Sequence, residues 1–328
     1  MTPTLAELGE GELLKRLARF APPGQLDDDT ACIGSDPRPL LVNTDVLVDG
    51  IHFSDATTDA HDVGWRAVAA NLSDLAASGA VSIDGITVAL VAPGSTPWSW
   101  VEGVYDGISA ALQQHGGTVL GGDCSSGSRR LLSVTALGRL GPLQLLRNAA
   151  QPGDVLISSG PHGLSRLGLA LLQKEPLVQT TSLSAALQDQ AISQHQRPRP
   201  PLDALNGLLA CKPAELPWRA GGTDSSDGLL AAVRGLCSSS GTGAQLDRSH
   251  LPRPQEWPHG DLWDRWCLAG GEDFELVLSI PPAWADALEP TLAGCRRFGQ
   301  ITDQTGSIVW SDDNKPVLDG GFDHFASS

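Results

Sequence analysis

The sequence is poor in basic residues and has no long hydrophobic run. Its 328 residues include 22 Lys and Arg against 38 Asp and Glu, which gives a formal net charge of −16. Clustered Lys and Arg hold the phosphates of nucleic acids, so this shortage argues against a nucleic-acid partner. No apolar stretch approaches the roughly 20 residues that a membrane-spanning helix needs. The composition therefore predicts neither a nucleic-acid partner nor a membrane partner.

The six cysteines are dispersed along the chain and include no C-x-x-C pair. This spacing indicates neither a zinc site nor a redox motif. We expect most of them to be small buried side chains in a reducing cytosol. Residues 10–20 show the helical spacing of an amphipathic helix, which does not fit a signal peptide. A cytoplasmic location is the resulting interpretation.

The signatures of common nucleotide-binding loops are also missing. There is no G-x-x-x-x-G-K-[ST] loop, and Gly241-Thr242-Gly243 lacks the third glycine of a dinucleotide fingerprint. The glycine loop and H-R-D motif of protein kinases are absent too. An acidic protein can still bind an anionic nucleotide when metal ions lie between the two. If this chain uses ATP, we expect it to do so through Mg²⁺ ions held by carboxylates.

Carboxylates beside small residues recur in six short segments. Each segment taken alone is more often a turn or a helix cap than a metal site. Their recurrence next to apolar runs favours oxygen-rich cation sites, because packed carboxylates repel one another unless hard cations such as Mg²⁺ lie between them. The segments are Asp27-Asp28-Asp29-Thr30, Asn43-Thr44-Asp45, Asn71-Leu72-Ser73-Asp74, Gly121-Gly122-Asp123, Asp224-Ser225-Ser226-Asp227-Gly228 and Gly270-Gly271-Glu272-Asp273.

Strand-like and helical patterns alternate, which indicates an α/β fold of the α+β type. The chain exceeds the roughly 100–200 residues of a typical domain, so we expect two domains, 1–148 and 149–328, separated near the Pro- and Gly-containing run 151–154. The predicted strands are 40–48, 86–91, 118–120, 131–140, 154–159 and 274–280, and the predicted helices are 62–78, 98–115, 164–174, 183–195, 202–211, 227–239 and 282–292.

Two acidic segments have a helical context. Asn71, Asp74 and Ser78 form one polar stripe on an otherwise apolar helix. The stripe is either a solvent face or part of a site, since short polar residues are poor helix formers. Asp224 and Asp227 precede a helix, where one could act as a cap while the helix N-terminus offers N–H groups to a phosphate. The pattern alone leaves both alternatives open.

Two further features are weak on their own. Gly121-Gly122-Asp123 is expected to end the strand 118–120, where glycines let a ligand approach the backbone closely. His52 falls in the predicted turn Asp49-Gly50-Ile51-His52-Phe53, and a turn histidine is more often structural than functional.

Seven ordered motifs resemble those of the thiamine-monophosphate kinase family, which is related to aminoimidazole ribonucleotide synthetase and selenophosphate synthetase. The resemblance covers nearly the whole chain, from about Gly11 to Phe325. The motifs are Asp28-Asp29, Asn43-Thr44-Asp45 with Gly50-Ile51-His52-Phe53, Asn71-Leu72-Ser73-Asp74-Leu75-Ala76, Gly121-Gly122-Asp123, Ser226-Asp227-Gly228-Leu229, Gly270-Gly271-Glu272-Asp273-Phe274-Glu275-Leu276 and Gly321-Phe322-Asp323-His324-Phe325.

This resemblance implies ATP-dependent phosphorylation of thiamine monophosphate to thiamine diphosphate by direct in-line transfer, without a phosphoenzyme. It also implies a two-domain fold like that of aminoimidazole ribonucleotide synthetase. In such a fold the N-terminal α/β domain binds metal and ATP and forms a homodimer through its sheet, and the C-terminal α/β domain completes the substrate site. The expected ligands are several Mg²⁺ ions, ATP as co-substrate and thiamine monophosphate.

The resemblance further implies roles for individual residues. Asp123, Arg147 and Asp227 are the expected catalytic residues, and Arg147 adds a fixed donor fork for phosphate. Phe322 offers an apolar face to the flat, cationic thiamine rings. The complete sets are Asp29, Asn43, Thr44, Asp45, Asp74, Asp123, Asp224 and Asp227 for Mg²⁺; Tyr105, Gly122, Asp123, Arg147 and Ser226 for ATP; and His52, Glu272 and Phe322 for thiamine monophosphate.

The sequence departs from the family pattern at one acidic motif, and rival functions exist. Asp27 stands where the family usually has Gly, which adds a third carboxylate. One rival is another activity of the superfamily, but a selenophosphate synthetase is expected to carry a catalytic Cys or selenocysteine near its N-terminus, whereas Cys32 follows the aspartates. A non-catalytic divalent-metal-binding protein is the other rival. It would not account for the Gly-Gly-Glu-Asp and C-terminal aromatic motifs.

Overall fold

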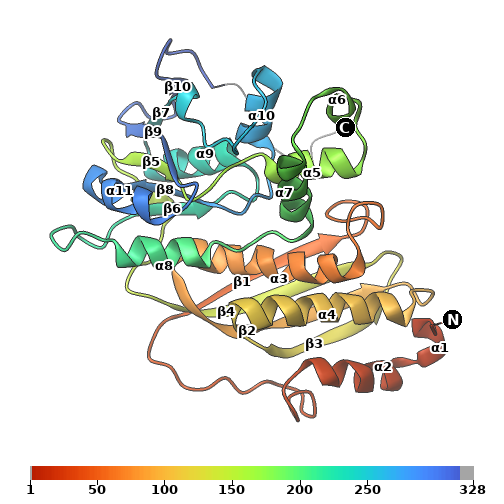
Figure 1. Ribbon diagram of the computed structural model, residues 1–328. Helices are drawn as coiled ribbons and strands as arrows, with labels where there is room; N and C mark the ends of the chain where they lie inside the picture. The colour runs from red at the N-terminus through yellow and green to blue at the C-terminus, as the bar shows by residue number, and fades with distance from the viewer. Residues whose placement is uncertain (1, 318–328) are drawn as a thin grey trace. The chain divides into compact units, whose positions relative to one another are not determined.

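The computed structural model describes residues 2–317, which divide into two compact units (Figure 1). The N-terminal unit comprises 2–75 and 80–140, and the C-terminal unit comprises 76–79 and 141–317. Each unit is built on its own β-sheet. The predicted α/β class is therefore confirmed. No helix among residues 2–317 combines the length and the apolar character that crossing a membrane requires.

The N-terminal unit contains a four-stranded sheet in the order β1-β4-β2-β3. β4 pairs antiparallel with β1 and with β2, and β2 pairs parallel with β3. Two long helices, α3 and α4, run along one face of this sheet (Figure 1). The elements are α1 (Leu5–Leu8), α2 (Glu10–Leu17), β1 (Leu40–Val48), α3 (Ala60–Ala77), β2 (Ala80–Ala92), α4 (Trp98–His115), β3 (Val119–Ser126) and β4 (Leu131–Leu140).

Helices α3 and α4 approach each other closely because each has a glycine at the contact. A Cβ added at Gly64 would lie 1.9 Å from the carbonyl oxygen of Val104, and one at Gly107 would lie 1.8 Å from that of His61. No larger side chain fits at either position without separating the helices. This contact fixes α3, and with it the polar residues that α3 carries.

The C-terminal unit contains a six-stranded sheet in the order β10-β7-β9-β5-β8-β6, covered on both faces. Leu156 and Val277 pack in one core cluster with α9, whereas Ile157 and Leu278 pack in a second with α8 and α11. The elements are β5 (Val155–Ser158), α5 (Leu164–Leu172), α6 (Pro176–Thr180), α7 (Ala185–Gln196), α8 (Leu202–Ala210), β6 (Gly221–Asp224), α9 (Leu229–Ser240), β7 (Gly243–Leu246), α10 (Asp261–Ala269), β8 (Leu276–Ile280), α11 (Pro282–Leu288), β9 (Arg296–Thr302) and β10 (Ile308–Trp310).

Several predicted elements agree with the structure to the residue, among them the strands 40–48 and 131–140 and the helix 98–115. The prediction that Gly121-Gly122-Asp123 ends a strand is wrong, because β3 continues through them to Ser126. This segment lacks apolar alternation because β3 is an edge strand with mostly exposed residues after Leu120. The expectation that most cysteines are buried is also wrong, since only Cys237 and Cys267 are.

Candidate functional site

A polar cluster in the N-terminal unit joins β1 to α3. The amide nitrogen of Asn43 donates to Asn71 Oδ1 and to Asp74 Oδ2, each at 3.1 Å. Asn71 is fully buried, and its own amide nitrogen donates to the carbonyl of Ala67 at 2.8 Å. A buried Asn71 cannot belong to a solvent face. The polar stripe of α3 therefore faces the sheet, which favours the site interpretation.

The cluster holds two carboxylates and an unsatisfied oxygen. Burial, followed by the charge of Asp74, raises the pKa of Asp45 to about 6. Asn43 Oδ1 is buried and has no hydrogen-bond partner. Within residues 2–317, no group of three or more His, Cys, Asp or Glu side chains is arranged to hold a metal ion. Mg²⁺ needs fewer protein ligands, because it commonly takes one or two carboxylates together with water and substrate phosphates.

Other residues predicted to bind metal lie outside this cluster. Thr44 alternates to the opposite face of β1, where its hydroxyl contacts that of Thr135 at 2.8 Å. Asp29 is exposed in an irregular segment before β1. Asp123 is exposed on the edge strand β3, and its Oδ1 accepts a hydrogen bond from its neighbour's N–H, Cys124, at 2.9 Å. Their metal-binding roles stay predictions.

Two residues predicted to contact ATP have structural roles of their own. A Cβ at Gly122 would lie 2.0 Å from the carbonyl oxygen of Val88, so glycine is required for β3 to pair closely with β2. Tyr105 is buried on α4 with its ring 5.3 Å from that of Phe20, and burial raises the pKa of its phenol. Neither position needs a nucleotide to explain its residue type.

His52 lies in the loop between β1 and α3 and has a defined ring orientation. Its Nδ1 accepts a hydrogen bond from the backbone N–H of Val48 at 3.1 Å. When the ring is neutral, this hydrogen bond assigns its proton to Nε2.

Sequence reasoning missed Arg130, which fixes the loop that carries His52. Its Nε donates to Asp49 at 2.8 Å, and Nη1 and Nη2 donate to Asp55 at 2.9 and 3.0 Å. The guanidinium also lies 4.8 Å from the ring centroid of Trp100. Arg130 thus joins the start of the loop to its middle. No motif signals it, because its partners are distant in sequence.

In the C-terminal unit, two acidic segments are joined by the backbone. Asp224 ends β6 and is buried, whereas Asp227 is exposed just before α9. Ser226 Oγ donates weakly to Asp224 Oδ1 at 3.4 Å. The carbonyl of Ser226 accepts a hydrogen bond of 2.7 Å from the N–H of Glu272. The expected nucleotide residue Ser226 and the expected substrate residue Glu272 are therefore held together.

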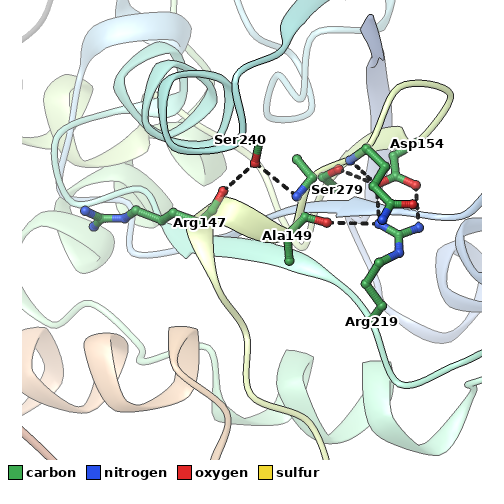
Figure 2. Close-up of polar contacts among 8 residues, drawn as sticks. Arg147, Ala149, Asp154, Arg219, Ser240 and Ser279 are labelled. Carbon is green, nitrogen blue, oxygen red and sulfur yellow. Dashed lines mark hydrogen bonds and ion pairs between the residues drawn. The ribbon is translucent and has the colours of Figure 1, made fainter. Parts of the chain in front are cut away.

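Arg147 is exposed in the same unit and is held at two points. Its Nε donates to Thr223 Oγ1 at 3.1 Å, and its carbonyl accepts a hydrogen bond of 2.9 Å from Ser240 Oγ. Figure 2 shows its guanidinium extending away from buried Asp154 and its partner Arg219. The exposed end keeps donors available for an anion. Phe322 lies outside the described residues.

Comparisons with known proteins identify relatives of the whole chain. Residues 27–140 match the family described as AIR synthase related protein, N-terminal domain. The chain is 51% identical to thiamine-monophosphate kinase of Prochlorococcus marinus, over 98% of this chain and 97% of that one. It is 43% identical to the Synechococcus elongatus thiamine-monophosphate kinase, over 99% and 98%. Its fold is similar to AaThiL complexed with AMPPCP and TMP, with a TM-score of 0.75, 28% identity and coverage of 99% and 100%.

Proposed function

The chain belongs to the thiamine-monophosphate kinase family, and we propose that the residues described above carry out the reaction of that family. The protein is an ATP-dependent kinase that phosphorylates thiamine monophosphate to thiamine diphosphate. The observation that carries this conclusion is the full-length similarity to two thiamine-monophosphate kinases, at 51% and 43% identity. A selenophosphate or aminoimidazole ribonucleotide synthetase activity has no such full-length support among these relatives.

Asn43, Asp45 and Asp74 are the residues that we propose to hold Mg²⁺ in the N-terminal unit. The unpartnered Oδ1 of Asn43 fits a cation, because an unsatisfied buried oxygen is otherwise costly. The raised pKa of Asp45 fits as well, since a cation would stabilise a carboxylate whose charge is disfavoured first by burial and then by Asp74. When bound, Mg²⁺ neutralises charge on the transferred phosphoryl group. Asn71 holds the Asn43 amide so that its oxygen remains free of protein donors.

Asp224 and Asp227 complete the proposed metal-binding set in the C-terminal unit, and Arg147 and Ser226 are proposed to contact ATP. The support is their placement at the end of β6 and the start of α9, a helix of 12 residues. The first N–H groups of such a helix favour an anion. Arg147 would neutralise phosphate charge with its exposed guanidinium. His52 and Glu272 are proposed to bind thiamine monophosphate, and Phe322 stays a prediction for the same role.

We also propose a homodimer formed through the N-terminal sheet, in the cytoplasm. The face of β1 opposite the helices exposes Leu40, Val42 and Val46, with Val42 58% exposed. Contiguous exposed apolar side chains favour a covering partner. Val42→Asp should shift the sedimentation coefficient from that of a dimer to that of a monomer, and an unchanged coefficient would contradict this interface. Six free cysteines fit a reducing compartment.

The metal assignment is tested by paired substitutions in each unit. Asp74→Asn and Asp227→Asn should each lower turnover at least about a hundredfold in a coupled assay of ADP release, because charge in the transition state loses its metal support. Asp106→Asn and Asp189→Asn replace exposed carboxylates on α4 and α7 and serve as matched controls. Comparing thiamine monophosphate with free thiamine as acceptor tests the substrate. Near wild-type turnover in both folded variants would contradict the metal assignment.

A further inference from the structure

The segment Gly271-Glu272-Asp273-Phe274 has an unusual backbone. Gly271, Glu272 and Phe274 have φ angles of 69°, 55° and 53°. A positive φ is ordinary for glycine, but it costs free energy for Glu and more for the bulky Phe. Such a conformation persists only where its surroundings over-determine it, and it is concentrated at functional sites. The question is which contacts hold it.

Asp273, between the two strained residues, supplies the strongest anchors. Its Oδ2 accepts a hydrogen bond of 2.6 Å from the N–H of Gly163, and its Oδ1 accepts one of 2.9 Å from that of Ser165. These donors lie at the N-terminus of α5. The carbonyl of Asp273 accepts a third bond of 2.9 Å, from the side-chain amide of Gln194 on α7. The residue is 1% exposed, so it contacts no substrate from solvent.

The residues on either side of Asp273 are fixed from a different direction. The N–H of Glu272 donates to the carbonyl of Ser226 at 2.7 Å, and the N–H of Glu275 donates to Ser225 Oγ at 3.0 Å. Asp273 therefore joins the segment to α5 and α7. Glu272 and Glu275 join it to residues 224–228. Glu272, whose backbone is fixed in this way, is only partly buried.

We infer that Asp273 is a positioning residue, which fixes the backbone of Glu272 so that its carboxylate meets thiamine monophosphate. This inference rests on the proposed substrate role of Glu272. If Asp273 served only to cap α5, the positive φ angles of its neighbours Glu272 and Phe274 would not be needed. The anchored carboxylate of Asp273 lies between the two positive-φ residues, Glu272 and Phe274, and holds their backbone.

The test separates substrate affinity from stability. Asp273→Asn replaces one acceptor oxygen by an NH₂ group, so one backbone N–H of α5 loses its partner, and we expect the KM for thiamine monophosphate to rise about tenfold, as for a lost buried hydrogen bond. The KM for ATP should stay within about twofold. Gln194→Met removes a milder anchor and should raise the same KM about threefold. Asp154→Asn, at another buried carboxylate of this unit, should lower Tm without changing either KM.

A double variant shows whether Asp273 acts through Glu272. Adding Asp273→Asn to Glu272→Ala should leave the KM for thiamine monophosphate as in Glu272→Ala alone, whereas multiplying effects would overturn the inference. If Glu272→Ala raises this KM and both Asp273→Asn and Gln194→Met leave it unchanged, the inference fails while the proposed function stands. If Glu272→Ala itself leaves the KM unchanged, the substrate role of Glu272 fails, and the inference fails with it.

Discussion

Asp154 in the C-terminal unit and Asp45 in the N-terminal unit have opposite surroundings. Buried Asp154 accepts hydrogen bonds from the guanidinium of Arg219. In the N-terminal unit, Asp45 faces the like charge of Asp74. A carboxylate compensated by protein groups needs nothing further, whereas a pair of neighbouring carboxylates favours an external cation. We expect an acid of the first kind to stabilise the fold, and we propose that the second kind binds a cation.

Removing the carboxylate of Asp154 should change the free energy of unfolding more than any other substitution considered below. Asp154 accepts hydrogen bonds from Arg219 at 2.6 and 2.8 Å and from Ser279 Oγ at 2.8 Å (Figure 2). Asp154→Ala should lower the free energy of unfolding by about 2–4 kcal/mol, because the partly buried Arg219 and the buried Ser279 lose their acceptor. Urea denaturation measures this. The exposed control Asp106→Asn should change it by less than about 0.5 kcal/mol. A loss under about 1 kcal/mol for Asp154→Ala would show that the pair is not compensating.

The pH dependence of stability tests two other buried acids of the C-terminal unit, Asp273 and Glu275. Burial, the largest cause, raises the pKa of both Asp273 and Glu275 to about 7, with the charge of Glu275 adding to the shift at Asp273. Between about pH 4 and 7 the folded state therefore retains protons that the unfolded state has released. The free energy of unfolding should fall as pH rises through this window, and the contribution is fully lost above pH 7.

The measurement is the difference between wild type and a variant. Asp273→Asn removes one of the two titrating groups, so the fall in stability between pH 5 and 7 should become shallower by up to about 1 kcal/mol per pH unit. Urea denaturation at several pH values gives the slopes. Equal slopes in the two proteins would mean that backbone hydrogen bonds keep Asp273 ionised throughout.

Replacing Asp45 should change stability less, and in the opposite direction. Asp45→Asn removes one of two repelling carboxylates, so the metal-free protein should become more stable by about 1 kcal/mol after screening by solvent. The same variant should lose the increase in Tm that added Mg²⁺ gives the wild type. Thermal unfolding with and without Mg²⁺ measures both. A metal-free variant that is less stable than wild type would place Asp45 among the structural acids.

The local sequence pattern was sufficient to predict helices and strands with clear periodicity. It failed for elements that depend on contacts with distant parts of the chain. β1 and α4 were predicted to the residue because apolar spacing and a glycine stop define them. β7, β9 and β10 were missed because the first and last are short and all three depend on sheet pairing. The stripe on α3 remained ambiguous in sequence, because only the hydrogen bond from Asn43 shows which face it occupies.

The same limit applies to the candidate site. Acidic residues in motifs were found from their recurrence, but the partners that fix them were not. Asp273 was noticed as part of Gly-Gly-Glu-Asp, whereas its bonds to α5 join residues more than a hundred positions apart. Arg130, in the connection between β3 and β4, carries no sequence signal, because its partners Asp49 and Asp55 are distant in sequence. A structure is therefore required to identify residues that position the functional side chains.

A substitution at Arg130 tests whether this residue positions His52 in the way that Asp273 is proposed to position Glu272. Its effect on stability should be small. Arg130→Lys keeps the charge but cannot form the paired bonds to Asp55 while also bonding Asp49. Because Asp55 is largely exposed, the cost in stability should stay below about 1 kcal/mol. A loosened loop should nevertheless raise the KM for thiamine monophosphate about two- to threefold through His52, with the KM for ATP unchanged.

Arg129→Lys, at the exposed neighbouring position, is the control and should leave both constants as in wild type. Steady-state kinetics at saturating Mg²⁺ measures all four values, and a rise in the KM for ATP alone would assign the His52 loop to the nucleotide.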